Sequence, residues 1–220
     1  MPRQTPPRRR SYDQYCAASR ALDAVGDRWT LLIVRELLGG PRRYTDLLAD
    51  LPGVSTDMLA TRLRDMERDG LALRRRLPAP ANASVYELTE RGGDLLPVLT
   101  ALATWGAPAL AERNPTDAVR AHWFAIPLLG PLGAAVGGDG ALVEVELPEG
   151  LFHVRTGFAP GRPSYGDGAA QAAPDARLAM DADTCRALGE GTATLAGAVK
   201  EGRVRVRGEG PVARRLRGEA

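Results

Sequence analysis

The chain has 220 residues, of which 44% are hydrophobic and 25% are charged, a globular balance that excludes wholesale disorder. The length favours two small domains as much as one large one. Two cysteines exclude a disulfide scaffold, and the longest apolar stretch, residues 125–138, is shorter than the roughly 20 residues that span a bilayer. No apolar segment follows Arg8-Arg9-Arg10, so we expect no signal peptide, no membrane partner and a cytoplasmic protein.

The charge divides unevenly along the chain, although the formal net charge is only +2. Residues 1–115 contain 17 arginines and 14 acidic residues, whereas residues 116–220 contain 12 basic and 13 acidic residues. The composition changes at the same place, from rich in Leu and Arg to rich in Gly, Ala and Val. Asn114-Pro115 is a helix-stopping pair. We therefore expect a disordered basic arm over residues 1–11, one domain over residues 12–114 and a second over residues 115–220.

The front half alternates helical periodicity with turn signals. We expect helices over residues 12–25, 29–37 and 44–51, then a helix of about 15 residues between the N-cap Ser55 and Gly70. Two strand-like runs, residues 71–77 and Ser84–Leu88, form a hairpin before a last helix that begins after Gly92. Three helices, a short helix–turn–helix and a basic hairpin predict a winged helix–turn–helix.

The helix after Ser55 is amphipathic, because Leu59, Leu63 and Met66 recur at helical spacing and leave a polar opposite side. Such a helix fits the major groove of double-stranded DNA, where base edges present a distinguishable pattern. The residues expected to face bases are Ser55, Thr56, Asp57, Thr61 and Arg64. Those expected at phosphates or in the wing are Arg42, Arg43, Arg62, Arg74, Arg75 and Arg76. Two alternatives remain open: an internal ion pair for Arg62, and a solvated strand edge for the hairpin arginines.

Several motifs of this half closely resemble the HxlR family of bacterial transcriptional regulators. They are Cys16, Val25-Gly26-Asp27-Arg28-Trp29, Gly40-Pro41-Arg42-Arg43-Tyr44, Leu51-Pro52-Gly53-Val54-Ser55 and Tyr86-Glu87-Leu88-Thr89. The resemblance covers roughly residues 12–110. It implies a homodimer that forms through the first and last helices of the domain, with two recognition helices reading a pseudo-palindrome. The last helix supports this, since it is apolar on more than one stripe; packing on the C-terminal half is the alternative.

Cys16 is a candidate thiol sensor, as in some HxlR-like regulators, with Arg20 one turn further along to lower its pKa. The alternative is a small buried helix residue. His122 and His153 lack the spacing of a zinc site, so we expect ordinary packing or surface roles. No phosphate-cradling or nucleophile motif occurs in the sequence. We therefore expect no metal, no cofactor and no enzymatic activity.

The back half predicts an α+β domain, with strands over Leu142–Leu147 and residues 151–156, 176–180 and 202–207. Helices are expected over residues 183–188, 192–199 and 212–217. The residues from Leu178 to Thr184, Gly191 and the residues from Lys200 to Gly208 are similar to the end of a sterol-carrier-protein-2-like (SCP2-like) domain. That resemblance implies an apolar tunnel for hydrophobic molecules. Candidate pocket residues are Trp123, Phe124, Phe152, Phe158, Tyr165 and Met180, unless they only fill a small core.

Together these patterns predict a dimeric DNA-binding transcriptional regulator of α+β class, a winged helix–turn–helix followed by a small SCP2-like domain. Repression of a pseudo-palindromic operator is the expected mode, modulated by a small apolar effector. The alternative is a lipid or small-molecule carrier whose winged helix serves for dimerisation. The two are distinguished by the arginine run of the hairpin, which has no purpose in a carrier.

Overall fold

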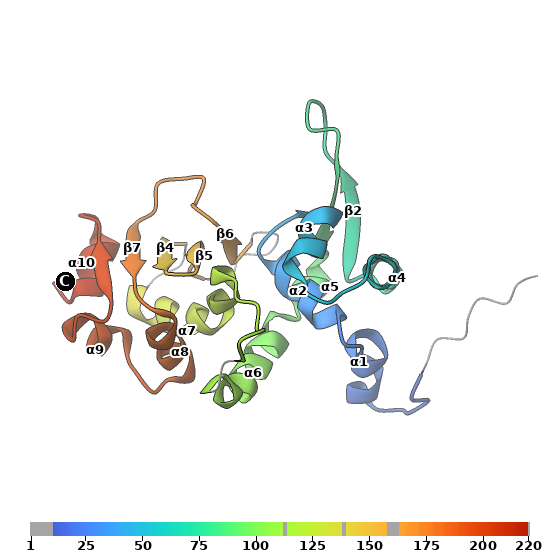
Figure 1. Ribbon diagram of the computed structural model, residues 1–220, viewed down its shortest axis with the longest axis horizontal. Helices are drawn as coiled ribbons and strands as arrows, with labels where there is room; N and C mark the ends of the chain where they lie inside the picture. The colour runs from blue at the N-terminus through green and yellow to red at the C-terminus, as the bar shows by residue number, and fades with distance from the viewer. Residues whose placement is uncertain (1–10, 112–113, 138–139, 158–162, 220) are drawn as a thin grey trace, which may run out of the picture.

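The computed structural model describes residues 11–111, 114–137, 140–157 and 163–219, so Phe158 and all but the last residue of the expected basic arm lie outside the described residues. The front half forms α1 (Ala17–Val25), α2 (Thr30–Leu38), β1 (Arg42–Arg43), α3 (Tyr44–Asp50), α4 (Thr56–Arg68), β2 (Ala72–Arg76), β3 (Ser84–Leu88), α5 (Glu90–Gly93) and α6 (Leu96–Gly106). Strand β3 lies between β1 and β2 in an antiparallel sheet. The β2–β3 hairpin projects from the molecule, and α4 lies near its base (Figure 1).

The expected helix over residues 12–25 is wrong at its start, because α1 begins only at Ala17. The carboxylate of Asp23 accepts hydrogen bonds from the Ser11 hydroxyl (3.0 Å) and the Tyr12 amide (2.9 Å), which turns the preceding segment back along the helix. Asp13 has a φ of 52°, which a right-handed helix cannot accommodate. Local side-chain hydrogen bonds therefore replace the first turn that the apolar spacing predicted.

The expected helix after Ser55 is confirmed, with 13 residues. The Ser55 hydroxyl accepts a hydrogen bond from the Met58 amide at 3.2 Å and so caps the first turn. Leu59, Leu63 and Met66 are buried, as their spacing predicts. They pack in one apolar cluster with residues of the other helices of this half, including Ile33. The core thus fixes which side of α4 remains polar and outward.

The back half is a five-stranded sheet with helices packed against it. After η1 (Ala107–Ala111) and η2 (Ala121–Phe124) come α7 (Ala125–Val136), β4 (Leu142–Leu147), β5 (Gly150–Arg155), β6 (Tyr165–Asp167), β7 (Ala176–Ala179), α8 (Ala182–Glu190), α9 (Leu195–Lys200), β8 (Arg205–Arg207) and α10 (Pro211–Arg217). The strand order is β6-β5-β4-β7-β8, with β4 and β7 parallel and the other pairs antiparallel. The α+β class is therefore confirmed.

Helix α7 did not emerge from the sequence, where the prolines and glycines of residues 125–138 marked a broken apolar stretch. Ala125, Leu128, Leu132 and Val136 are nevertheless buried at helical spacing. Pro127 lies in the first turn, where the missing amide hydrogen would have no partner in the helix. Burial of this face against β5, α8 and α10 offsets the cost of Pro131 inside the helix. Packing against the rest of the back half therefore stabilises a helix that the local prolines and glycines disfavour.

None of the described helices is long and apolar enough to cross a membrane.

Candidate nucleic-acid interface

The outward side of α4 presents the residues that the sequence assigns to base contacts. Ser55, Thr56, Asp57 and Arg64 are exposed, and Thr61 is half-buried. The Arg64 guanidinium lies along its own helix, donating to the Thr61 hydroxyl and to the Ala60 carbonyl, each at 3.2 Å. These are exposed, neutral partners that a guanine edge could replace. The Ser55 hydroxyl is already engaged as the helix cap, so this residue contributes mainly through position.

A tyrosine from the preceding helix fixes the start of α4. The Tyr44 hydroxyl donates to the Thr56 carbonyl at 2.7 Å, so α3 and the first turn of α4 are held together. The amide of Arg43 donates to the Asp46 carboxylate at 3.1 Å and begins α3 in a capping arrangement. The short helix–turn–helix therefore has its geometry set by polar contacts at both helix starts.

The three hairpin arginines of β2 are all exposed, but their charges are not equally free. Arg75 donates three hydrogen bonds to the Glu87 carboxylate at 2.8–3.0 Å, and this pair raises the Arg75 pKa. Arg74 and Arg76 instead donate to the neutral side chains of Ser84 (3.3 Å) and Asn82 (2.8 Å). Alternate residues of a strand point to opposite faces. Arg74 and Arg76 thus share one face of the hairpin with uncompensated charge.

Besides Arg75, two more of the arginines expected at phosphates have carboxylate partners. Arg62 lies 3.5 Å from Asp27 and 3.2 Å from Asp65, which is the internal pairing that the sequence left open. Arg42 lies 3.9 Å from Asp50 and 4.0 Å from Asp167, and its side chain is only 17% exposed. Arg42 thus faces carboxylates in this structure, and its expected contact with the DNA backbone stays a prediction. Arg43, the next residue along β1, is exposed.

Arg42 belongs to a buried polar junction between the two halves. The Glu36 carboxylate on α2 is fully buried and meets His122 Nε2 at 2.7 Å and Trp123 Nε1 at 2.9 Å. Burial raises the Glu36 pKa, but the hydrogen bond from His122 and the Arg35 charge outweigh it and hold the pKa low. Tyr165 donates its hydroxyl to the Arg35 carbonyl. The junction thus ties α2 to η2 and β6.

Sequence reasoning missed this junction, treating His122 as ordinary packing and Tyr165 as a pocket residue. Glu36, Asp50 and His122 place ligand-type atoms within 4.8 Å of one another, a spacing that a metal ion could bridge. Arg35 lies 2.8 Å from Glu36, and Arg120 lies 3.6 Å from Asp50. These arginines already supply the positive charge that a cation would bring. One signal was available: Glu36 interrupts the otherwise apolar face of α2.

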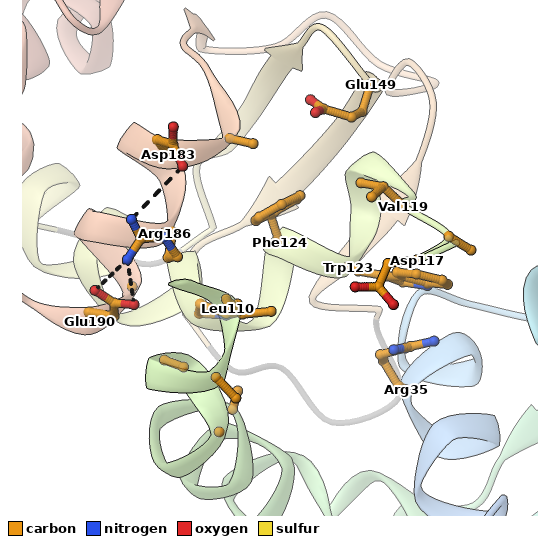
Figure 2. Close-up of a pocket in the computed structure, with 18 of the residues that line it drawn as sticks. Arg35, Leu110, Asp117, Val119, Trp123, Phe124, Glu149, Asp183, Arg186 and Glu190 are labelled. Carbon is orange, nitrogen blue, oxygen red and sulfur yellow. Dashed lines mark hydrogen bonds and ion pairs between the residues drawn. The ribbon is translucent and has the colours of Figure 1, made fainter. Parts of the chain in front are cut away.

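A cavity of about 1070 Å³ opens between the two halves, beside the junction (Figure 2). Trp123 and Phe124 line it, as expected for a ligand pocket, but the other described candidates do not. Phe152, Tyr165 and Met180 are buried in the core instead. The side chains that complete the lining come from α2, α6, η1, α7 and α8, so the cavity belongs to both halves. This cavity therefore lies between the halves, whereas the resemblance implied a tunnel within the C-terminal half.

Cys16 is exposed at the start of α1, which excludes the alternative of a small buried residue. The Ser19 amide, followed by the Ser19 hydroxyl, lowers the pKa of the Cys16 thiol. Hydrogen bonds at the helix start, rather than the expected charge of Arg20, are the cause. Cys185 on α8 is buried, and burial raises its pKa to about 12.

Comparison with known proteins matches residues 24–114 to the model of the HxlR-like helix-turn-helix family. An HTH-type transcriptional regulator of Synechocystis, sll1512, is 36% identical over 99 residues, which cover 45% of this chain and 73% of the relative. The regulator Rv3095 of Mycobacterium tuberculosis is 40% identical over 107 residues, covering 48% of this chain and 67% of the relative. The reduced form of YodB from Bacillus subtilis matches 46% of this chain and 100% of that structure, with 29% identity and a TM-score of 0.40.

These matches each cover less than half of this chain. The named relatives are transcriptional regulators, so the carrier interpretation finds no support among them. Through its front half, the chain belongs to the HxlR-like helix-turn-helix family of transcriptional regulators.

Proposed function

We propose that this protein is a dimeric transcriptional repressor that reads a pseudo-palindromic operator through α4 and holds the flanking phosphates with the β2–β3 hairpin. The observation that carries the proposal is the side-by-side exposure of a capped, polar helix face and a basic wing (Figure 1). The helix supplies base-facing residues, and the hairpin supplies charge that is indifferent to sequence. Repression follows because a dimer bound to the operator blocks polymerase without further parts.

The individual contacts follow from the charge of each side chain. We assign base contacts to Thr56, Asp57, Thr61 and Arg64, with Ser55 setting the start of the helix. Phosphate contacts fall to Arg43, Arg74 and Arg76, which have no carboxylate partner among the described residues. Arg75 and Arg62 would first have to exchange a carboxylate for a phosphate. Both therefore contribute less than their charge implies.

Dimerisation is supported by the apolar surface of the helices at either end of the front half. Val98, Leu102 and Trp105 of α6 are exposed, as is Leu22 of α1. Trp105 is 84% exposed, an unusual position for so large an apolar side chain in a monomer. A second copy of this chain would bury this surface and place two α4 helices on one face of the DNA.

The back half serves, in this proposal, as an SCP2-like effector domain over residues 115–220 that acts on the DNA-binding domain over residues 12–114. The sheet covered by helices and the cavity beside it support such a role. An effector would act by favouring one relative position of the two recognition helices over another.

A mobility-shift assay with DNA from upstream of the protein's own gene tests the operator proposal. We expect retardation at low salt, saturation at two chains per site, and a footprint with two-fold symmetry whose half-sites lie about one helical turn apart. Absence of retardation at low salt would overturn the proposal. A footprint without two-fold symmetry would overturn its dimeric form.

A further inference from the structure

The cavity between the two halves has walls that combine aromatic side chains with carboxylates. Trp29, which precedes α2, is one of the lining residues. Trp123 and Phe124 line the cavity from η2, and Phe124 extends into the opening (Figure 2). A volume of about 1070 Å³ is ample for a ligand of drug size. Flat aromatic faces bind apolar bodies and also attract positive charge. The shape therefore suits a bulky molecule with an apolar surface.

The charge of the lining is unbalanced. Five carboxylates border the cavity, and the two arginines there are already engaged. Arg186 pairs with Glu190 at 3.0 Å and lies 3.9 Å from Asp183, whereas Arg35 is held by Glu36 and stacks on Trp123. The remaining acidic residues of the lining are Asp117, Glu149 and Asp181.

Two of these three carboxylates have no cationic partner in the part of the chain that the structure describes. Asp181 caps α8 through the Thr184 amide at 2.7 Å. Asp117 accepts only from Asn114, and Glu149 has no ion pair among the described residues. The two approach the opening from different sides, Asp117 beside Trp123 and Glu149 beyond Phe124 (Figure 2). A ligand between them would meet negative charge on both sides.

We propose that this cavity binds a lipophilic organic cation, with the apolar body against Phe124 and Leu110 and the positive charge facing Asp117 and Glu149. The aromatic faces and the surplus carboxylates favour the same class of ligand, since both attract positive charge. Asp117 and Glu149 are exposed at the rim of the cavity, so their charge acts on the ligand as it enters. A lipophilic anion of equal size would meet repulsion at both carboxylates. The charge of the ligand, rather than its hydrophobicity alone, is what the cavity selects.

The position of the cavity also connects it to the proposed dimer surface. Ala103 and Ala107 contribute to the lining, whereas Leu102 and Trp105 are exposed. At 100° per residue the two pairs lie on nearly opposite sides of this helical segment. A bound cation would therefore press on one side of α6 while a second copy of this chain packs on the other. This coupling to DNA binding rests on the proposed function, but the binding of the cation does not.

Isothermal titration of the full chain with tetraphenylphosphonium and tetraphenylborate tests the proposal, because the two ions share shape and apolar surface and differ in charge. We expect one phosphonium per chain, bound at least tenfold more tightly than the borate. Equal affinity, a preference for the borate, or no binding of the phosphonium would overturn the proposal.

Variants localise the site. The double variant Asp117→Asn and Glu149→Gln should weaken phosphonium binding at least fivefold and leave borate binding equal or stronger. Glu146→Gln is the matched control, because Glu146 is exposed on β4 and does not line the cavity. Unchanged affinity in the double variant, with an unchanged thermal midpoint, would overturn the assignment.

Operator binding in the presence of phosphonium then separates this inference from the proposed function. We expect the wild-type affinity for DNA to change at least threefold, and that of the double variant to remain constant. Cation binding by a chain that never binds DNA would leave the cavity assignment standing and overturn the proposed function. Cation binding without any effect on operator affinity would overturn the coupling through α6.

Discussion

The hairpin and the junction both depend on arginines, which are exposed in the hairpin and enclosed at the junction. On β2, Arg74 and Arg76 extend into solvent and donate only to neutral side chains, so their charge remains available to a phosphate. At the junction, Arg35 and Arg42 are enclosed beside the carboxylates of Glu36 and Asp50. They also contact the other half, since Arg35 stacks on Trp123 and Arg42 lies 4.0 Å from Asp167. Exposed charges contribute little to folding stability and much to association with a polyanion. Removing one member of a buried pair is costly, because it leaves the other group buried without a partner.

The neighbouring residues Arg42 and Arg43 show that an exposed and an enclosed arginine can be adjacent in the sequence. Both residues were expected at the DNA backbone, and both lie in β1. Because alternate residues of a strand face opposite sides, only Arg43 is exposed, and Arg42 faces Asp50 and Asp167. The periodicity of a two-residue strand, which no sequence pattern revealed, decides which arginine is available.

The largest effect is expected at the junction, on replacing Glu36 with alanine. The change leaves His122, Trp123 and Arg35 without their shared carboxylate in a buried site. Breaking such a buried pair costs about 3–5 kcal/mol. We expect that loss in the free energy of unfolding measured by urea denaturation. Glu36→Gln is the control, because it keeps an acceptor for Trp123 and should cost less. A loss below about 1 kcal/mol for Glu36→Ala would contradict the structural role of the junction.

A second expected effect lies on the exposed apolar surface of α6. Trp105→Glu places a charge where a second copy of the chain should pack. The loss of a large aromatic side chain from an interface reduces the free energy of association by about 2 kcal/mol or more. We expect dissociation to monomers in sedimentation velocity at micromolar concentration. Leu73→Glu changes an exposed leucine of β2 in the same way and should leave the dimer intact. Dimers in both variants would exclude α6 as the interface.

A variant of Arg64 tests whether the exposed face of α4 recognises bases. Arg64→Ala should reduce discrimination between the operator and unrelated DNA by about 1–3 kcal/mol if the side chain binds a guanine. Stability should change little, because the Arg64 partners are exposed and neutral. Competition binding with operator variants at each position measures the effect. Retained discrimination at every position would remove Arg64 from the base contacts.

The two cysteines offer the same contrast of exposed and buried groups within one molecule. The Ser19 hydrogen bonds lower the Cys16 pKa, so the Cys16 thiolate persists to lower pH than in an unperturbed cysteine, whose pKa is about 8.5. We expect iodoacetamide to alkylate Cys16 with a rate that rises with pH about a midpoint below that value. Cys185 should react only after unfolding, since burial raises its pKa to about 12. A midpoint at or above that of free cysteine would remove the chemical basis for a thiol sensor.

Much of the fold follows from local sequence signals, and the winged helix shows why. Ser55 caps α4 through its own hydroxyl, and Gly70 takes the positive φ of 68° that ends the segment. Strands β3 and β4 have the predicted bounds, because their alternation is local. Helix α7 could not be predicted in this way, since its stability comes from packing against elements distant in the sequence.

The candidate site likewise has parts that follow from local sequence patterns and parts that depend on contacts between distant residues. Exposed polar residues on α4 and β2 follow from helical and strand periodicity. The junction brings together Glu36 and His122, which lie 86 positions apart, so no local spacing could reveal the pair. The cavity likewise exists only where the two halves meet.

The salt dependence of operator binding tests the central claim most directly, because release of counterions measures how many phosphates the protein neutralises. We predict a slope of log Kd against log salt that decreases by about one for Arg76→Ala and by less for Arg75→Ala, whose charge Glu87 already compensates. Arg205→Ala is the matched control, an exposed arginine on β8 of the other sheet, and should leave the slope unchanged. Equal slopes for the wild type and Arg76→Ala, or an equal decrease for Arg205→Ala, would contradict the assignment of the hairpin to DNA.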